Sequence, residues 1–105
     1  MYRIGLFSKI NKVTIKTLRY YDEVDLLKPA FVDEENSYRY YTSDQLPLLH
    51  KIIALRQVGF SIDEILAIHY GQDSVAIFER REQELKILVE ESQRQLGQIH
   101  NILKK

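Results

Sequence analysis

The first twenty-one residues carry the side chains best suited to bind an anion. They hold five basic residues and no acidic one: Arg3, Lys9, Lys12, Lys16 and Arg19. Residues 22–72 hold nine acids against four bases, and residues 73–105 hold six of each, so the net charge of zero hides a basic N-terminal segment. Such a segment can bind phosphate groups if its bases fold onto one face. A solvated helix face would have a similar composition, so charge alone leaves both interpretations open.

No group of residues has the spacing of a catalytic or metal-binding site. The sequence contains no cysteine, which excludes disulfides, zinc ribbons, thiolate metal sensing and a cysteine nucleophile. The three histidines have no metal-ligand spacing with one another or with acids: His50, His69 and His100. A glycine-rich phosphate loop and a nucleophile elbow are also absent from the sequence. We therefore expect no enzyme, no cofactor and no bound metal ion.

Length and composition favour one small globular domain with an appended element. The chain has 105 residues, of which 45% are hydrophobic, enough to form a core. No apolar run approaches the roughly 20 residues that a membrane helix needs. The N-terminus also lacks the apolar stretch of a signal peptide. We therefore expect a soluble, cytoplasmic protein.

Two short helices are predicted to position the basic residues. The apolar residues of the first helix, expected after Gly5, keep helical spacing: Ile4, Phe7 and Ile10. Thr14 is a good N-cap for the second, whose apolar face would hold Ile15, Leu18 and Tyr21. Helices separated by about four residues are typical of a helix-turn-helix. The polar face of the second helix presents long side chains that could reach into a groove: Lys16, Thr17, Arg19, Tyr20 and Glu23.

A β-hairpin is predicted to follow. Pro29 ends the helical pattern, because the residue before a proline is pushed out of the α region. Residues 30–32 and 38–41 are rich in β-branched and aromatic side chains, and the polar residues 33–37 separate them. A hairpin is only marginally stable unless it packs on something. Directly after a helix-turn-helix, it would form a wing.

Two further helices are predicted by capping boxes. The boxes pair a hydroxyl residue with a Gln or Glu three positions later: Thr42 with Gln45, and Ser61 with Glu64. We expect the first of these helices to end at Gly59 and the second to end near Gly71. Pro47 would lie beyond the first turn of a helix capped by Thr42 and would lose a backbone bond. A cap at Ser43 or Asp44 would ease that strain.

The last third of the chain predicts one long helix, from Ser74 to Lys105. A narrow, nearly heptad stripe runs along it: Leu85, Leu88, Val89, Ser92, Leu96, Ile99 and Leu103. The helix would extend roughly 45 Å, and so narrow a stripe favours pairing with another helix. We expect its six apolar residues to form a homodimer interface. Ser92 and Gly97 weaken the stripe, which favours one antiparallel pairing over a long zipper. A helix folded back onto its own domain is the alternative.

Five short motifs, in this order and spacing, form a highly specific pattern: Tyr-Arg-Ile-Gly (2–5), Thr-Leu-Arg-Tyr-Tyr-Asp (17–22), Leu-Leu-Lys-Pro (26–29), Tyr-Arg-Tyr-Tyr (38–41) and Leu-Arg-Gln-Val-Gly-Phe (55–60). The sequence thereby resembles the MerR family of bacterial transcription regulators. The resemblance implies a mainly α fold. Residues 1–71 would form a winged helix-turn-helix with a hairpin wing and a second, helical wing at 43–70. Residues 72–105 would form the dimerisation coiled-coil helix.

The resemblance also implies partners. Family members bind a two-fold operator in a promoter as dimers, through an antiparallel coiled coil. They bend and untwist that DNA so that RNA polymerase can use it, which makes them activators. Most members of the drug-binding branch continue into an effector domain after the long helix. Because the helix ends at 102–105 without a capping glycine, we expect a chain cut at the linker, with the effector ligand unspecified. A protein that works without a ligand is the alternative.

The resemblance places six side chains at the DNA: Arg19, Tyr20 and Tyr21 from the recognition helix, Tyr38 and Arg39 from the first wing, and Arg56 from the second. Arg19 and Arg39 can clamp phosphate through paired donors. Tyr20 and Tyr38 can donate a hydroxyl to phosphate. For Tyr21 a core role is equally open, and Arg56 could simply close a helix C-terminus.

Residues near the start of the recognition helix are better placed to touch base edges. These are Lys16 and Thr17, to which we add the N-cap Thr14. Tyr40 and Tyr41 are expected to pack within the hairpin instead.

Some positions depart from the family pattern. Lys12, Asp25 and Ser37 stand where many members have glycine, so a left-handed backbone there would be strained, more for Lys than for Asp. Leu6 replaces a usual glutamate and is expected to be exposed. Asp25 and the lack of cysteine are similar to the multidrug-binding activators, and argue against the thiolate-based metal and redox sensors.

A coiled-coil interaction module or adaptor that ignores DNA is the main alternative function. A recombination-directionality factor, which also uses a winged helix, is another, but the C-terminal helix fits it less well. The charge pattern discriminates, because a pure interaction module has no reason to gather five bases in its first helical pair.

Overall fold

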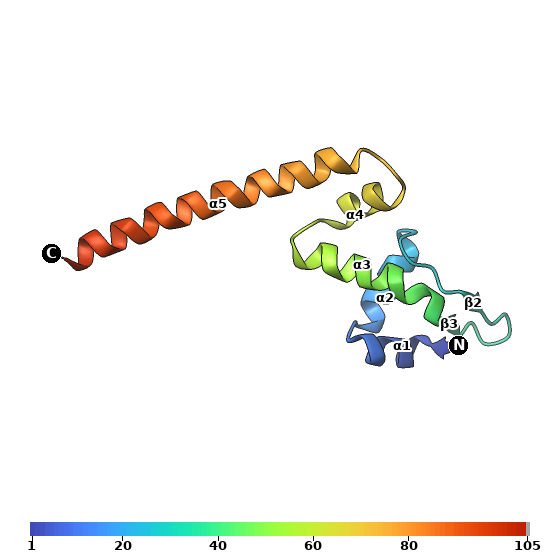
Figure 1. The fold of residues 1–105 in the computed structure, drawn as a ribbon. Coiled ribbons are helices and arrows are strands. Elements are labelled where there is room, and N and C mark those ends of the chain that lie inside the picture. Colours follow the sequence, from blue (N-terminus) through green and yellow to red (C-terminus); the bar gives the residue numbers. More distant parts are fainter. Residues whose placement is uncertain (105) are drawn as a thin grey trace. The chain divides into compact units, whose positions relative to one another are not determined.

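The computed structural model describes residues 1–104, and Figure 1 labels its elements. In chain order these are β1 (Tyr2–Arg3), α1 (Ile4–Asn11), α2 (Ile15–Glu23), β2 (Phe31–Val32), β3 (Arg39–Tyr41), a 3₁₀ turn (Ser43–Gln45), α3 (Leu46–Gln57), α4 (Ile62–His69) and α5 (Ser74–Leu103). The chain divides into two compact units, Met1–Leu66 and Ala67–Lys105. The predicted mainly helical fold with a small hairpin and a long last helix is confirmed.

Local signals build the helix-turn-helix as predicted. The side chain of Thr14 caps α2, because its Oγ1 accepts a hydrogen bond of 3.0 Å from the backbone N–H of Thr17. Between the two helices Lys12 adopts a left-handed conformation with φ of 55°. The Val13 N–H then donates to the carbonyl oxygen of Ser8 at 3.1 Å, which closes the end of α1. One detail of the prediction is wrong: α1 begins at Ile4 and includes Gly5.

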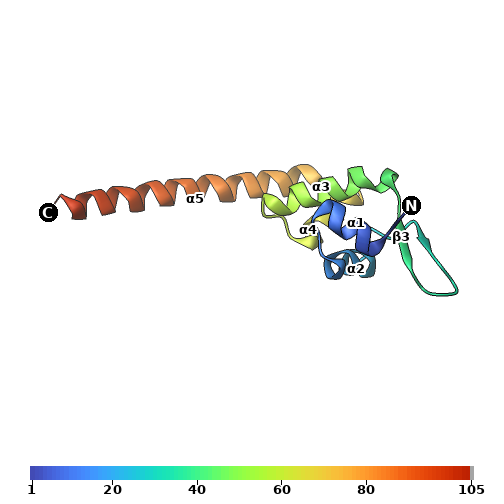
Figure 2. The same cartoon turned by 90° about the horizontal axis from the view of Figure 1, so that it is seen from below.

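The hairpin is confirmed, but it belongs to a three-stranded antiparallel sheet of order β1-β3-β2. In this sheet Phe31 pairs with Tyr40, and Tyr2 pairs with Tyr41. The sequence did not predict β1, because two residues carry no alternating pattern that could reveal a strand. Figure 2 shows the turn between β2 and β3 extending away from α1 and α2. The added strand ties the N-terminus to the wing.

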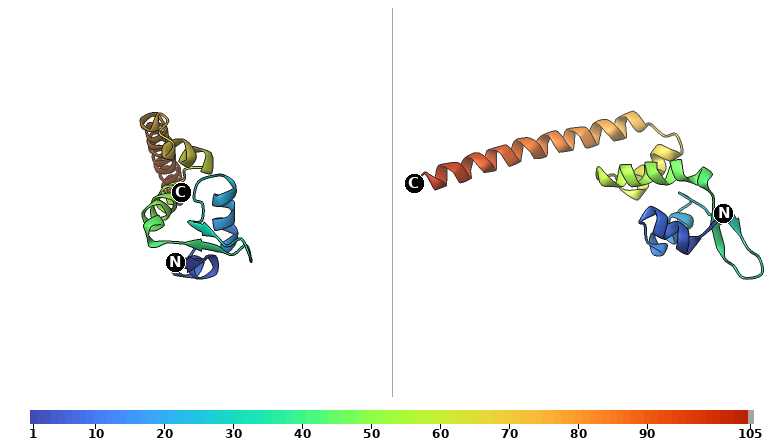
Figure 3. Two further views of the ribbon diagram at one scale, coloured as in Figure 1. Left: turned by 90° about the vertical axis from the view of Figure 1, so that its right-hand side faces the viewer. Right: turned by 60° about the horizontal axis from the view of Figure 1, so that its bottom comes forward.

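Aromatic and aliphatic side chains form the core of the first unit. In the left-hand view of Figure 3, α1, α2 and α3 are arranged around the short sheet. Tyr41 is fully buried, and its ring stacks on that of Phe7 with centroids 4.6 Å apart. The other buried hydrophobic residues of this unit are Leu18, Tyr21, Leu26, Leu27, Leu49, Ile52, Leu55, Phe60 and Ile65. Within residues 1–104, the buried Tyr41 hydroxyl has no hydrogen-bond partner, and burial raises its pKa.

A 3₁₀ turn accommodates Pro47. The Thr42 N–H donates to Oε1 of Gln45 at 3.0 Å, so the predicted capping box forms. This box caps the 3₁₀ turn, however, and α3 itself begins only at Leu46. Pro47 therefore lies in the first turn of the α-helix, where a missing N–H costs no intrahelical bond. Neither Ser43 nor Asp44 is the N-cap of α3.

The second predicted capping box is confirmed, and so are the two glycines predicted to end α3 and α4. The Ser61 N–H donates to Glu64 Oε1 at 2.9 Å, and the Glu64 N–H donates to Ser61 Oγ at 3.1 Å. Gly59 and Gly71 follow α3 and α4 with φ of 93° and 78°, the left-handed conformation that glycine adopts without strain.

The long helix α5 spans 30 residues, and none of them is buried. It begins at an N-cap that was not predicted, where the Ala76 N–H donates to Asp73 Oδ1 at 3.3 Å. Its end at Leu103 is close to the predicted one; the predicted last residue, Lys105, lies outside the described part of the chain. Among the described helices, none is long and apolar enough to cross a membrane.

Candidate nucleic-acid interface

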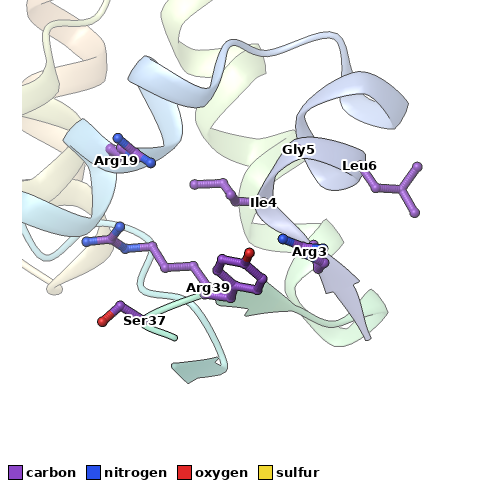
Figure 4. A pocket seen from close by; sticks show the side chains of 8 residues that line it. Arg3, Ile4, Gly5, Leu6, Arg19, Ser37 and Arg39 are labelled. Atoms are coloured by element: carbon purple, nitrogen blue, oxygen red, sulfur yellow. The ribbon is translucent and has the colours of Figure 1, made fainter. Parts of the chain in front are cut away.

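Three arginines surround a hollow of about 340 Å³ on the first unit. The residues that line it come from β1, α1, α2 and the wing: Arg3, Ile4, Gly5, Leu6, Arg19, Ser37, Tyr38 and Arg39. In Figure 4 the three arginines project from three different elements, whereas the side chain of Leu6 points away from the hollow. None of the eight lining residues is acidic. The hollow is therefore suited to an anion, and guanidinium groups match phosphate oxygens in geometry as well as charge.

Arg3 belongs to the basic N-terminal segment, but the sequence does not assign it to the DNA-binding site. Its position follows from β1, in which Arg3 pairs with Tyr40 of the central strand. The Arg3 guanidinium carbon lies 3.9 Å from the centre of the Tyr38 ring. This cation–π contact holds both side chains at the rim of the hollow. The Tyr-Arg-Ile-Gly motif at the N-terminus was the available signal, because it was part of the family pattern.

Arg39 is positioned by an acidic residue of α2. Its Nε donates to Asp22 Oδ2 at 3.3 Å, across a separation of 17 residues. This contact uses one of the five guanidinium donors, so the others can still reach a phosphate. Lys28 also binds Asp22, at 3.2 Å, and Asp25, at 2.9 Å. Hydrogen bonds to Asp25 and then to Asp22 raise the pKa of Lys28. The network links the wing to α2.

The exposed face of α2 carries the residues predicted to enter a groove. A second hollow of about 340 Å³ runs along this face and is lined by Ile15, Lys16, Arg19, Tyr20 and Glu23. Arg19 lines both hollows, so one side chain joins the arginine cluster to the face of the helix. Lys16 and Tyr20 are exposed beside it. The hydroxyl groups of Thr14 and Thr17 bond to each other at 2.8 Å. For the two threonines, base contact stays a prediction.

Two of the predicted DNA-binding residues have structural roles outside the arginine hollow. Tyr21 is only 5% exposed and belongs to the core. Burial raises the pKa of its hydroxyl, and the positive charge of Arg56 opposes that rise. Arg56 Nη1 donates to the carbonyl oxygen of Phe60 at 2.9 Å and so closes the turn after α3. These are the structural roles that the sequence left open, and contact of either residue with DNA stays a prediction.

The three non-glycine residues at family glycine positions all have a left-handed backbone. Their φ angles are 55° at Lys12, 63° at Asp25 and 61° at Ser37. The strain expected at these positions is therefore present. Leu6 is exposed, as predicted, with 52% of its surface accessible.

The predicted dimer interface lies along α5. All six of its residues are exposed in the single chain: Leu85, Leu88, Val89, Leu96, Ile99 and Leu103. Apolar side chains must be exposed in the single chain if they are to contact a second helix. The pairing of two α5 helices stays a prediction.

Comparison with known proteins reveals clear relatives. The multidrug-efflux transporter 1 regulator of Bacillus subtilis is 52% identical over 64 residues, which cover 61% of this chain and 23% of that protein. The transcriptional regulator ZntR of Escherichia coli K12 is 36% identical over 102 residues, covering 89% of this chain and 72% of that protein. In structure, the chain is similar to EcmrR in a cryo-EM structure of the EcmrR–DNA complex, with a TM-score of 0.84 and 46% identity. That match covers 97% of this chain and 38% of EcmrR.

The chain thus spans about a quarter of the first relative and little more than a third of the EcmrR chain. Residues 2–71 match the family model described as MerR HTH family regulatory protein. This match covers the winged helix-turn-helix and the arginine hollow, and ZntR extends the similarity to most of α5. The chain therefore belongs to the MerR HTH family of regulatory proteins.

Proposed function

We propose that this chain binds a two-fold promoter operator as a homodimer and distorts the DNA so that transcription is activated. Residues 1–71 are the proposed DNA-binding domain, and residues 72–105 are the proposed dimerisation helix. The hollow lined by Arg3, Arg19 and Arg39 carries the proposal. Three guanidinium groups with no acid among the lining residues form a site that favours a phosphate.

Phosphate contacts in this hollow would set the register of α2 on the duplex. Contacts to the DNA backbone position a protein without reading the sequence. Since Arg19 also lines the hollow on the exposed face of α2, a phosphate held there brings Lys16 and Tyr20 towards the groove. The side chains of α2 then supply sequence discrimination, and the arginines supply most of the salt-dependent affinity.

The relatives support this assignment and imply the further partners. EcmrR, 46% identical over the compared region, was solved in complex with DNA, and double-stranded DNA is the partner proposed here. RNA polymerase is the second partner that promoter activation implies. A regulator that acts by binding and bending DNA needs no catalytic group. Such a regulator works in the cytoplasm, where the bacterial chromosome lies.

A gel shift with the DNA upstream of this protein's own gene tests the proposal. Family regulators often control their own promoters, so this fragment is the first choice of operator. We expect one dimer-sized complex that forms in preference to scrambled DNA and weakens steeply between two salt concentrations. Absence of binding to either fragment at low salt would contradict the proposal and favour an interaction module that ignores DNA.

A further inference from the structure

The stripe on α5 extends further towards the N-terminus than the predicted dimer interface. Alternating steps of three and four residues connect nine positions: Val75, Phe78, Glu82, Leu85, Val89, Ser92, Leu96, Ile99 and Leu103. This is an unbroken heptad pattern over almost the whole helix. Two of the nine positions, Glu82 and Ser92, are polar. The partner helix must satisfy both of them, because a polar group buried against hydrocarbon is costly.

A parallel, in-register pairing fails this requirement. It would place Glu82 opposite the partner's Glu82, and two carboxylates at one point of a seam repel each other. The flanking positions would also conflict, because Arg81 would approach the partner's Lys86. An antiparallel pairing avoids both contacts.

Antiparallel pairing allows several registers, one heptad apart, and only one of them places the two polar positions of the stripe opposite each other. In that register Glu82 lies opposite the partner's Ser92, whose hydroxyl can donate to the carboxylate. The remaining pairs are all apolar: Val75 with Ile99, Phe78 with Leu96, and Leu85 with Val89.

The neighbouring registers leave polar groups opposite apolar ones. A shift of one heptad towards the C-terminus places Glu82 opposite the partner's Ile99 and Ser92 opposite the partner's Val89. A shift the other way places Glu82 opposite the partner's Leu85. Either shift would place the Glu82 carboxylate against hydrocarbon of the partner helix, which offers it no hydrogen-bond donor.

The surface of α5 has a shallow, open hollow where the matched register places its two-fold axis. This hollow, of about 410 Å³, is lined by Glu82, Leu85, Lys86, Val89 and Glu90. The axis would pass between Leu85 and Val89, so the apolar side chains of the partner would enter this hollow. Leu88, which is 56% exposed and belongs to the predicted interface but not to the nine heptad positions, would meet the partner's Leu88.

One contact at the axis is unfavourable in isolation, because Lys86 would approach the partner's Lys86. Each lysine is already paired within its own helix, since its Nζ lies 2.9 Å from Glu82 Oε1. This ion pair offsets the repulsion between the two lysines, and a flexible lysine can also direct its charge into solvent.

We propose that α5 pairs antiparallel with α5 of a second copy in the single register that places Glu82 opposite the partner's Ser92. The inference rests on the proposed homodimer and adds the register. The Glu82–Ser92 pair favours this register over the two neighbouring ones, as buried polar residues do in other coiled coils.

Cysteine cross-linking tests the register directly, because the chain contains no cysteine of its own. The full chain carrying Glu82→Cys with Ser92→Cys should form a covalent dimer under mild oxidation, seen on a non-reducing denaturing gel. The matched control, Glu82→Cys with Ile99→Cys, reports the register one heptad away and should cross-link at least about tenfold more slowly, because disulfides require Cα atoms within roughly 7 Å. Circular dichroism checks that both variants remain helical.

A second pair of variants leaves Glu82 and Ser92 intact. Phe78→Cys with Leu96→Cys should cross-link, and Leu85→Cys with Leu96→Cys, which fits the shifted register, should not. Faster cross-linking of either control would overturn the proposed register, and so would a dimer in which no pair reacts. Sedimentation of the unmodified chain as a monomer would overturn the second copy as partner. None of these readouts involves DNA, so a failed register and a failed DNA-binding function are distinguishable.

Discussion

The arginine hollow makes a quantitative prediction about the salt dependence of DNA binding. Each phosphate that a protein neutralises contributes about 0.9 to the slope of log affinity against log salt. Arg19 is exposed and lines the hollow, so Arg19→Ala should remove one phosphate contact per protomer without unfolding the domain. A dimer would lose two contacts, and its slope should fall by about 1.8. Across a fourfold rise in salt, the dimer variant should then lose roughly tenfold less affinity than the parent chain.

The assay is a titration of the operator fragment at three or more salt concentrations, with affinity measured by gel shift or fluorescence anisotropy. At low salt the variant should bind more weakly by about 1.5–3 kcal/mol per protomer, the range for hydrogen bonds to charged groups. Arg94→Ala is the matched control. It removes the same charge from α5, outside both the hollow and the apolar stripe. If Arg19→Ala and Arg94→Ala show the same slope, Arg19 does not contact phosphate and the interpretation of the hollow is refuted.

Three other predictions concern stability and assembly. Tyr41→Phe removes a buried hydroxyl without a partner, so urea unfolding should show a gain of about 1 kcal/mol. Burial raises the pKa of Tyr41, so this hydroxyl loses its proton at a lower pH in the unfolded chain than in the folded chain. The free energy of unfolding should therefore fall as the pH rises above about 10, and it should fall less in Tyr41→Phe. A larger alkaline loss in Tyr41→Phe would contradict this sign. Lys12→Gly relieves the left-handed strain at φ 55° and should add about 0.5–1 kcal/mol to the free energy of unfolding; a loss in the same urea assay would show that no strain is stored there. Leu85→Asp with Leu96→Asp should give folded monomers in sedimentation, whereas persistent dimers would exclude the stripe on α5 as the interface.

The features that could be predicted from the sequence are those whose cause lies within a few residues. Thr14 caps α2 through the N–H three positions later, and Ser61 and Glu64 cap each other across the same interval. The glycine that ends α3 is equally local, since only its own backbone conformation is involved. The periodic spacing of apolar residues located the helices for the same reason, because a helix returns to the same face every 3.6 residues.

The family pattern extended this prediction to positions that no local rule could assign. It placed Arg19 on the recognition helix and Arg39 in the wing, and both line the same hollow. It also identified the glycine positions at which Lys12 and two other residues adopt a left-handed backbone. Periodicity and capping alone could not have done so, because strain at a single residue leaves no repeating signal.

The tertiary structure decided the features that join distant parts of the chain. The strand β1 has only two residues and no pattern of its own, and it exists because Tyr2 pairs with Tyr41. That pairing places Arg3 over Tyr38 and completes the arginine cluster. Likewise, the burial of the Tyr41 ring depends on a stacking partner, Phe7, more than thirty residues away. Sequence by itself determined which helices form and which side chains are charged, because those properties are local. Only the folded chain decided which charges share one site, since proximity across the fold is set by packing.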